Sequence, residues 1–275
     1  MPELPEVESV RQTLMPRILG RRVAKVSAAP GKLVRPDLAS FRRGLVGRRV
    51  LASDRRGKLL ILELEGGAYW TVHLGMTGQV IMAASRPRAD HVHVTVEFDD
   101  QGERFFYRDV RRFGHLDFCP DRAALLAGPL ANMGPDALGM AGGVFLERLA
   151  GRGAPLKGLL LDQRVLAGVG NIYADEALHR ARLSPLCRAS QVSGDDLLRL
   201  NQALQETLAE SLAQGGSSVR NFVDAEGRPG TFQHAHRVYR RTGQACPTCG
   251  QPVEKIVLAG RSTHFCPNCQ PRPQG

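Results

Sequence analysis

The first residues of the chain, Met1, Pro2 and Glu3, place a small residue after the initiator methionine and a carboxyl group beside it. A small second residue normally allows the methionine to be removed, which would leave the secondary amine of Pro2 at the N-terminus. An α-amino group titrates near pH ~8, so a useful fraction is nucleophilic at neutral pH. A secondary amine that attacks a sugar aldehyde carbon gives a cationic iminium directly. The opening therefore predicts a Schiff-base nucleophile, although most proteins that begin Met-Pro make no use of the amine.

Four of the six cysteines form two C-x-x-C pairs, at Cys246, Cys249, Cys266 and Cys269. Sixteen residues separate the inner two, a spacing typical of a four-cysteine zinc site with a hairpin between the pairs. Disulfides are disfavoured without an export signal, and a redox pair would not need the duplication. We predict one structural Zn²⁺ ion, and ordinary buried thiols at Cys119 and Cys187.

Basic residues gather toward the two ends of a chain whose net charge is +10. Residues 1–60 carry 14 Lys and Arg against 5 Asp and Glu, 61–216 carry 15 against 19, and 217–275 carry 8 against 3. This distribution suits a polyanion as partner, although a solvated surface explains the charge equally well. Only five basic residues are lysines, and Lys58 draws attention because lysine, unlike arginine, can give up its proton.

Length and composition indicate a globular protein of more than one domain, with 275 residues and 43% hydrophobic content. No apolar run approaches the roughly 20 residues of a transmembrane helix. The N-terminus is acidic rather than signal-like, so we expect a cytoplasmic protein with no membrane segment.

The elements that must position these groups change character near residue 129. Residues 5–19 predict a helix with Val7, Val10, Leu14 and Ile18 on its apolar stripe. Strands are predicted at 23–26, 59–64, 68–74, 79–82, 92–98 and 105–107, with a turn at 99–102. These predict a β-sandwich or barrel behind a leading helix. Helices follow near 144–150, 155–162, 171–182 and 194–214, with Asn171 as an N-cap, and 215–235 predicts a mobile loop.

Three motifs, in this order along the chain, resemble the bacterial formamidopyrimidine-DNA glycosylases, which remove 8-oxoguanine and ring-opened purines and then cut the strand. They are the opening Met1–Glu8 segment, the Gly168–Glu176 segment GVGNIYADE, and the four-cysteine finger. The resemblance implies an α+β multidomain fold with one zinc ion. Its domains would be an N-terminal β-sandwich over 1–130, a helix-two-turns-helix domain with a lesion loop over 131–238, and a zinc finger over 239–275. The implied partner is damaged double-stranded DNA, bound by a monomer.

The resemblance also implies catalytic roles. Pro2 would attack C1′ of the damaged nucleotide and expel the base, and β- and δ-elimination would follow. Glu3 would act as general acid and base at the sugar, supported by Glu6, although a first-turn glutamate also favours the helix dipole. Lys58 would contact phosphate and aid elimination, and a plain phosphate contact is as well supported as proton transfer. Arg261 would hold phosphate near the lesion, where we favour electrostatic stabilisation over proton donation.

A further implied set fills the gap left when the damaged base leaves the stack. Met76, Arg111 and Phe113 match this set, with Arg111 paired to the unpartnered cytosine. By pattern alone Met76 and Phe113 are core residues, but the flanking glycines favour exposed loops. Residues that match positions contacting the DNA backbone are His91, Arg152, Lys157 and Asn171.

Two other functions compete with this one. The related endonuclease VIII type has the same architecture but prefers oxidised pyrimidines, and the opening motif with the Met76, Arg111 and Phe113 set favours the purine branch. A zinc-dependent DNA-binding protein without catalysis would explain the charge and the finger. It would leave the Pro2-Glu3 opening and Lys58 unexplained.

Overall fold

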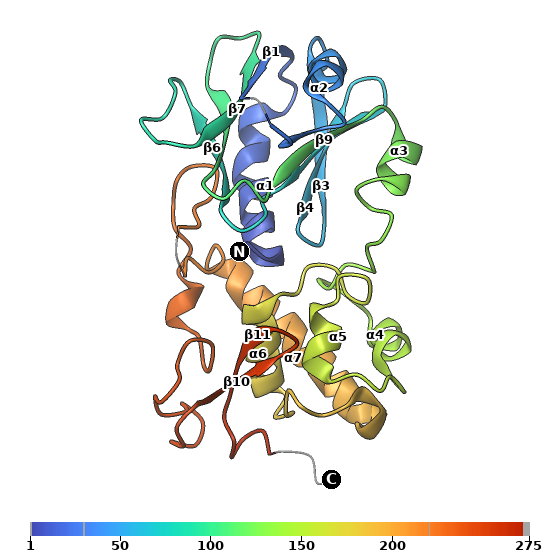
Figure 1. Cartoon of the computed structure of the whole chain (residues 1–275), viewed down its shortest axis with the longest axis vertical. Helices are drawn as coiled ribbons and strands as arrows, with labels where there is room; N and C mark the ends of the chain where they lie inside the picture. The colour runs from blue at the N-terminus through green and yellow to red at the C-terminus, as the bar shows by residue number, and fades with distance from the viewer. Residues whose placement is uncertain (1, 30, 220, 272–275) are drawn as a thin grey trace. The chain divides into compact units, whose positions relative to one another are not determined.

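The computed structural model describes residues 2–29, 31–219 and 221–271. Met1, whose removal is predicted, and Arg220, in the predicted loop, lie outside the described residues. Contacts divide the chain into two compact units, which are Met1–Asn132 with Gln214–Thr231, and Met133–Ala213 with Phe232–Gly275 (Figure 1). The contacts group 214–231 with the first unit and the finger with the helices of the second, and the three-domain division predicted from the sequence stays a prediction. No helix in the described part of the chain is long and apolar enough to cross a membrane.

The first unit contains a leading helix and two β-sheets, as predicted for a sandwich. Helix α1 spans Leu4–Ile18, and two shorter helices are α2 (Leu38–Leu45) and α3 (Arg122–Ala127). One sheet has the order β1 (Val23–Ala28), β7 (Val92–Phe98), β8 (Arg104–Asp109) and β6 (Gly78–Ala83). The other has the order β2 (Val34–Arg35), β9 (His115–Cys119), β5 (Ala68–His73), β4 (Leu59–Leu64) and β3 (Val50–Arg56). All pairings are antiparallel except β2 with β9.

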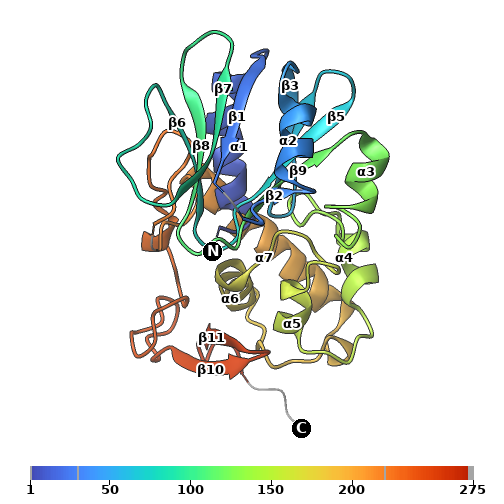
Figure 2. The same cartoon turned by 45° about the horizontal axis from the view of Figure 1, so that its top comes forward.

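Helix α1 forms because its apolar residues recur at helical spacing. The predicted stripe of Val7, Val10, Leu14 and Ile18 is confirmed, since each is at most 1% exposed and joins the core shared by both sheets. Figure 2 shows α1 between the two sheets. Burying such a side chain stabilises the fold by about 1.5–3 kcal/mol. The stripe therefore fixes the helix, and with it the position of the N-terminal residues.

The predicted strands and the turn at 99–102 are confirmed, whereas the sequence analysis missed β2, β3, β9, α2 and α3. Strand β3 lies at a sheet edge, and its exposed and half-buried residues do not alternate with buried ones, so its sequence carries no alternation to detect. Helix α2 is short, and Asp37 caps it by accepting a hydrogen bond from the backbone of Ser40. Its Gly44 packs so closely on Phe118 that a Cβ there would lie 2.5 Å from the ring.

The second unit is helical and ends in a β-hairpin. The four predicted helices are confirmed as α4 (Gly142–Leu149), α5 (Leu156–Leu161), α6 (Asn171–Arg180) and α7 (Gly194–Ala213). Short 3-10 helices span Ala189–Gln191 and Phe232–His234, and the hairpin pairs β10 (Glu254–Leu258) with β11 (Arg261–Phe265). The prediction of Asn171 as an N-cap is wrong, because Gly170 is the N-cap and Asn171 is the first helical residue.

The segment 214–231 lacks helix and strand in its described residues but is attached to the first unit. Ala225 is fully buried in the core, accepts a hydrogen bond from the backbone of Met82 (3.2 Å), and donates one to Thr13 Oγ1 (3.1 Å). Closer to its start, Ser217 is held by Glu6. These anchor points fix parts of the segment, and its predicted mobility stays a prediction.

Candidate active site and metal centre

Pro2 and Glu3 lie at the buried start of α1. Glu3 is the N-cap residue and is 3% exposed. Glu6, 1% exposed, accepts a hydrogen bond from the Glu3 backbone through Oε2 (2.7 Å) and one from the Ser217 backbone through Oε1 (2.7 Å). The second contact requires Gly216 beside it, because a Cβ there would lie 2.9 Å from Oε1 at a φ of +86°. Glu6 thus fixes the backbone next to Pro2 and the beginning of the 214–231 segment together.

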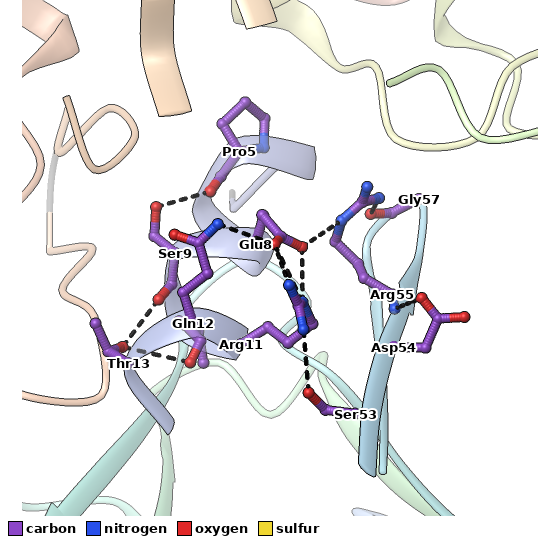
Figure 3. Close-up of polar contacts among 11 residues, drawn as sticks. Pro5, Glu8, Ser9, Arg11, Gln12, Thr13, Ser53, Asp54, Arg55 and Gly57 are labelled. Atoms are coloured by element: carbon purple, nitrogen blue, oxygen red, sulfur yellow. Dashed lines mark hydrogen bonds and ion pairs between the residues drawn. The ribbon is translucent and has the colours of Figure 1, made fainter. Parts of the chain in front are cut away.

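Lys58 lies in the tight turn between β3 and β4, and it is 8% exposed. A polar network joins this hairpin to α1 (Figure 3). Glu8 accepts hydrogen bonds from Arg11 Nη2 (2.6 Å) and from Arg55 Nε (3.2 Å), and Arg55 Nη1 donates to the carbonyl of Gly57 (2.9 Å). Gly57 directly precedes Lys58, so the network holds the turn that carries Lys58 against α1, the helix that follows Pro2 and Glu3.

The Glu8 network should make stability depend on pH. Burial raises the Glu8 pKa, but the hydrogen bond and charge of Arg11, with Gln12 and Arg55, lower it by more, to below 4.5. A lowered folded-state pKa gives stability that is complete above the unfolded pKa and lost as pH falls through the folded one.

We therefore expect Glu8→Gln to lower the free energy of unfolding by about 1.5–3 kcal/mol at pH 7. The difference from the wild type should shrink below about pH 4.5. Denaturant titrations at pH 7, 5 and 3.5 measure it. Asp162→Asn, which removes an exposed ion pair with Arg164, is the control and should change stability by less than about 1 kcal/mol. A difference for Glu8→Gln that stays constant with pH would contradict the assignment.

Two histidines that the sequence analysis missed lie near Lys58. His73 and His115 are paired across β5 and β9, and their rings stack with centroids 5.0 Å apart. Burial lowers the pKa of each to about 4, and the charge of Lys58 adds to the effect at His73. Both rings are therefore neutral at pH 7. The strand pairing that joins them was not available from the sequence.

The structure brings Met76, Arg111 and Phe113 together. Arg111 Nη1 lies 3.2 Å from Met76 Sδ, and its guanidinium carbon lies 4.6 Å from the centre of the Phe113 ring. Phe113 is 55% exposed although it is a large aromatic residue, so it is not a core side chain. The three side chains form one cluster at the surface, in which Arg111 and Phe113 are exposed and Met76 is half-buried. Two loops carry it, residues 74–77 and 110–114.

Of the residues predicted to contact the DNA backbone, His91 and Arg152 are exposed and Lys157 is not. The Lys157 ammonium is fully buried and donates to Asp175 Oδ1 (2.6 Å), Thr263 Oγ1 (2.7 Å) and the carbonyl of Ser262 (2.9 Å). In this structure it joins α5, α6 and β11 inside the second unit. A direct phosphate contact by Lys157 stays a prediction, and this burial does not support it.

Asn171 is linked to the strand that carries Arg261 through Ser262, the residue after Arg261. The Asn171 Nδ2 donates to the carbonyl of Ser262 (2.8 Å), which Lys157 also contacts. Asp175 accepts hydrogen bonds from the backbone and the ring of His264 (2.9 and 3.0 Å). Arg261 itself is exposed at the start of β11. Buried polar contacts from α5 and α6 thus fix the strand that presents Arg261.

The four cysteines of the two C-x-x-C pairs converge on one point. Their sulfur atoms all lie within 4.8 Å of one another, with Cys249 and Cys266 3.4 Å apart and Cys246 and Cys269 3.9 Å apart. A tetrahedral zinc–thiolate site has sulfur–sulfur distances of about 3.8 Å, so the arrangement fits Zn²⁺. The ring of His179 lies 3.3 Å from the sulfur of Cys246 through Nε2. Such outer contacts orient ligands, and no motif or spacing in the sequence indicates this one.

Glu176, at the end of the GVGNIYADE segment, is 3% exposed, and the sequence analysis assigned it no role. It accepts hydrogen bonds from the backbone N–H groups of Arg237, Val238 and Tyr239 at 2.8–3.0 Å. Burial raises the Glu176 pKa despite these contacts. The carboxyl group therefore holds the chain that enters the finger against α6.

Comparison with known proteins agrees with this arrangement. Family models match in sequence: the formamidopyrimidine-DNA glycosylase N-terminal domain over 1–116, the H2TH domain of the same enzymes over 133–223, and a zinc finger found in FPG and IleRS over 243–272. A Thermus thermophilus formamidopyrimidine-DNA glycosylase is 44% identical over 277 residues, which cover 98% of each chain.

Two solved structures show the same fold. A mutant of Lactococcus lactis FPG in complex with DNA containing Fapy-dG is 34% identical, with a TM-score of 0.91 over 98% of this chain and 100% of that one. MutM in complex with DNA containing carbocyclic 8-oxo-G is 34% identical, with a TM-score of 0.90 over the same shares. The four clustered cysteines lie in the segment that matches the zinc finger, and their arrangement fits one structural zinc ion. The chain belongs to the formamidopyrimidine-DNA glycosylase family.

Proposed function

We propose that this protein is a bifunctional DNA glycosylase and abasic-site lyase, which acts as a monomer on duplex DNA. It removes 8-oxoguanine and formamidopyrimidines through a Schiff base on Pro2. The observation that carries the proposal is the position of Pro2 and Glu3 at the buried start of α1, in a chain of this family. Relatives with this fold were solved with Fapy-dG and 8-oxo-G in their DNA, which supports oxidised purines as substrates.

The first chemical step replaces the bond between sugar and base by a bond between sugar and Pro2. The unprotonated Pro2 nitrogen attacks C1′, the bond from C1′ to the base breaks, and the base leaves with a proton from a general acid. Glu3 is the candidate acid and base, because its carboxyl group is beside the nucleophile and withdrawn from water. Opening of the sugar ring then gives the iminium, which is cationic because Pro2 is a secondary amine.

The iminium makes strand cleavage possible by acidifying the protons on C2′. Loss of one C2′ proton expels the 3′ phosphate, and a second elimination expels the 5′ phosphate. Lys58 and Arg261 are the cations proposed to stabilise these leaving phosphates, since each comes from an element held by buried contacts. Arg261 acts by charge alone because a guanidinium does not release its proton. For Lys58, phosphate contact and proton transfer both remain open.

Excision requires the damaged base to leave the helix, and the surface cluster of Met76, Arg111 and Phe113 is proposed to occupy the gap. We expect Arg111→Ala to lower the preference for cytosine opposite the lesion by about tenfold to a hundredfold, since one good base contact provides about 1–3 kcal/mol of discrimination. Single-turnover excision of 8-oxoguanine opposite cytosine and opposite adenine measures it. Arg43→Ala, which removes an exposed arginine of α2, controls for lost charge.

Phe113→Ala should slow base excision while sparing cleavage at a ready-made abasic site, because that substrate has no base to extrude. Base–aromatic stacking contributes about 1–3 kcal/mol, so excision should slow by about tenfold or more. The ratio of the two rates on matched duplexes is the readout. Equal losses on both substrates would mean that Phe113 serves folding or general DNA binding.

The proposed substrate class is tested by cleavage of duplexes that carry either 8-oxoguanine or thymine glycol, compared side by side. Faster cleavage at 8-oxoguanine supports the purine enzyme. Faster cleavage at thymine glycol would assign the chain to the endonuclease VIII activity. Binding to both without cleavage would leave a non-catalytic DNA-binding protein.

A further inference from the structure

Asp109, the last residue of β8, is completely buried and organises the loop that carries Arg111 and Phe113. Its Oδ1 accepts a hydrogen bond from the Arg111 backbone (3.2 Å), and its Oδ2 accepts one from the Gly114 backbone (2.8 Å). The carboxylate therefore closes a turn of which Arg111 and Phe113 form the exposed part. None of the roles proposed above uses it.

The same carboxylate also holds the other loop of the cluster. The hydroxyl of Thr77, the residue after Met76, donates a hydrogen bond to Asp109 Oδ1 (2.5 Å). The oxygen of this hydroxyl, Thr77 Oγ1, accepts a hydrogen bond from the Arg111 backbone (3.0 Å). The strands continue this contact, since Gly78 pairs with Asp109 in the β6–β8 ladder. Thr77 thus forms hydrogen bonds both to the Asp109 carboxylate and to the Arg111 backbone, which the same carboxylate holds. The two loops therefore share one set of hydrogen bonds.

Close packing around Tyr107 leaves little freedom for either loop to move alone. The Tyr107 hydroxyl lies 3.3 Å from the carbonyl of His73 and 3.4 Å from Asp109 Oδ2. A Cβ on Gly78 would lie 2.5 Å from the Tyr107 hydroxyl oxygen, and a Cβ on Gly114 would lie 1.8 Å from it, so both positions require glycine. Burial, and then the Asp109 charge, raise the Tyr107 pKa, so the hydroxyl stays protonated and donates.

A third segment is attached at the same point. The Asp109 backbone donates to the carbonyl of His91 (3.0 Å), and the Asp109 carbonyl lies 2.9 Å from His93 Nε2. His91 adopts a φ of 67°, an unusual conformation for a residue with a side chain, and this contact helps to hold it. Asp109 therefore contacts three segments, which carry Met76, His91, and Arg111 with Phe113.

We propose that Asp109 and Thr77 are positioning residues, which hold the two loops as one rigid unit so that Met76, Arg111 and Phe113 enter the duplex together. This inference rests on the gap-filling role given above. The physical advantage is preorganisation. Side chains that are already fixed at the right spacing lose little conformational entropy when they replace a base, whereas loose loops would have to be ordered during extrusion.

Thr77→Val tests the inference most cleanly, because it keeps the shape of the side chain and removes the hydroxyl. Thr77→Ser keeps the hydroxyl and is the matched control. We expect Thr77→Val to slow 8-oxoguanine excision opposite cytosine by about tenfold, the change that follows from losing one hydrogen bond to a charged group. The preference for cytosine over adenine should fall with it, and cleavage at a ready-made abasic site should be spared. Thr77→Ser should equal the wild type in all three measurements.

Asp109→Asn is the second variant, and Arg111→Ala is the reference for the gap-filling role. If positioning is the mechanism, Thr77→Val combined with Arg111→Ala should lower the cytosine preference no further than Arg111→Ala alone. Circular dichroism and thermal unfolding of each variant identify loss of folding. A parallel loss of all three rates in Thr77→Val, or a cytosine preference unchanged by it, would overturn the inference.

The Arg111→Ala variant distinguishes failure of the positioning role of Thr77 and Asp109 from failure of the gap-filling role. If Arg111→Ala lowers the cytosine preference and Thr77→Val does not, the positioning role is wrong and the gap-filling role stands. If Arg111→Ala itself leaves the preference unchanged, the gap-filling role is wrong and the positioning role falls with it.

Discussion

Enzyme that retains Met1 is expected to lose lyase activity and borohydride trapping to background. With Met1 in place the Pro2 nitrogen is a tertiary amide, which has neither a basic lone pair nor a proton and cannot form an iminium. Protein made in cells with inhibited methionine aminopeptidase provides this form. Treatment of the same preparation with purified aminopeptidase should then restore activity, which makes each sample its own control.

Two further measurements make this result specific to the amine. Binding to a duplex with a tetrahydrofuran abasic analogue, which cannot form a Schiff base, should be little changed by Met1 unless the extra residue blocks the site. Pro2→Gly with its N-terminus exposed keeps a primary amine, so activity should be weakened rather than abolished. Full glycosylase and lyase activity in protein whose mass still includes Met1 would rule out Pro2 as the nucleophile.

Loss of one zinc ligand should have the second large effect. Cys249→Ser is expected to remove the metal and specific DNA binding, because structural zinc contributes about 10–16 kcal/mol to folding of isolated fingers at pH 7. The first unit should stay folded, since its core of two sheets and α1 contains none of the ligands. Elemental analysis, DNA binding and thermal unfolding measure the three outcomes.

Cys187→Ser is the matched control for this substitution. Cys187 is a half-buried thiol outside the cluster, so the variant should keep one zinc ion and its affinity for DNA. Active wild-type enzyme without zinc would contradict the assignment. Unfolding of the β-sheets in Cys249→Ser would contradict the independence of the first unit from the finger.

Elements with a strong local pattern were predictable from the sequence. The stripe on α1, the alternation of β7 and the spacing of the cysteines each reflect one dominant physical requirement, which is burial in the first two and tetrahedral ligation in the third. The edge strand β3 has no such pattern because only its first residue is buried and the others are exposed or half-buried without alternation. Helix α2 depends on the cap at Asp37 and on the close approach of Gly44 to Phe118, and the second of these is a tertiary contact.

Within the candidate site, residue identity was easier to predict than residue environment. Lys157 was expected at the DNA backbone, but three acceptors from β11 and α6 enclose its ammonium. Asn171 was expected to cap its own helix, and its amide instead reaches the carbonyl of Ser262, 91 residues away. Contacts between residues so distant in the chain depend on the folded topology, which no local spacing encodes.

The same limit explains why Glu8 and Asp109 were not singled out. Acidic residues are common on surfaces, and sequence alone does not reveal which of them is buried. Glu8 is identified by its contacts to Arg11 and Arg55, and Asp109 by the backbone N–H groups and the hydroxyl that surround it. Both join loops or turns that bear proposed functional residues, so they matter for position more than for chemistry.

Schiff-base formation on Pro2 can be tested directly by identifying the residue that borohydride links to DNA. Wild-type enzyme is mixed with a duplex containing 8-oxoguanine opposite cytosine, reduced, digested, and mapped by mass spectrometry. We expect one adduct, on the N-terminal peptide with Pro2 as its first residue and the sugar on its nitrogen. An adduct on Lys58 or another lysine, or no adduct from enzyme that excises the base, would contradict this expectation.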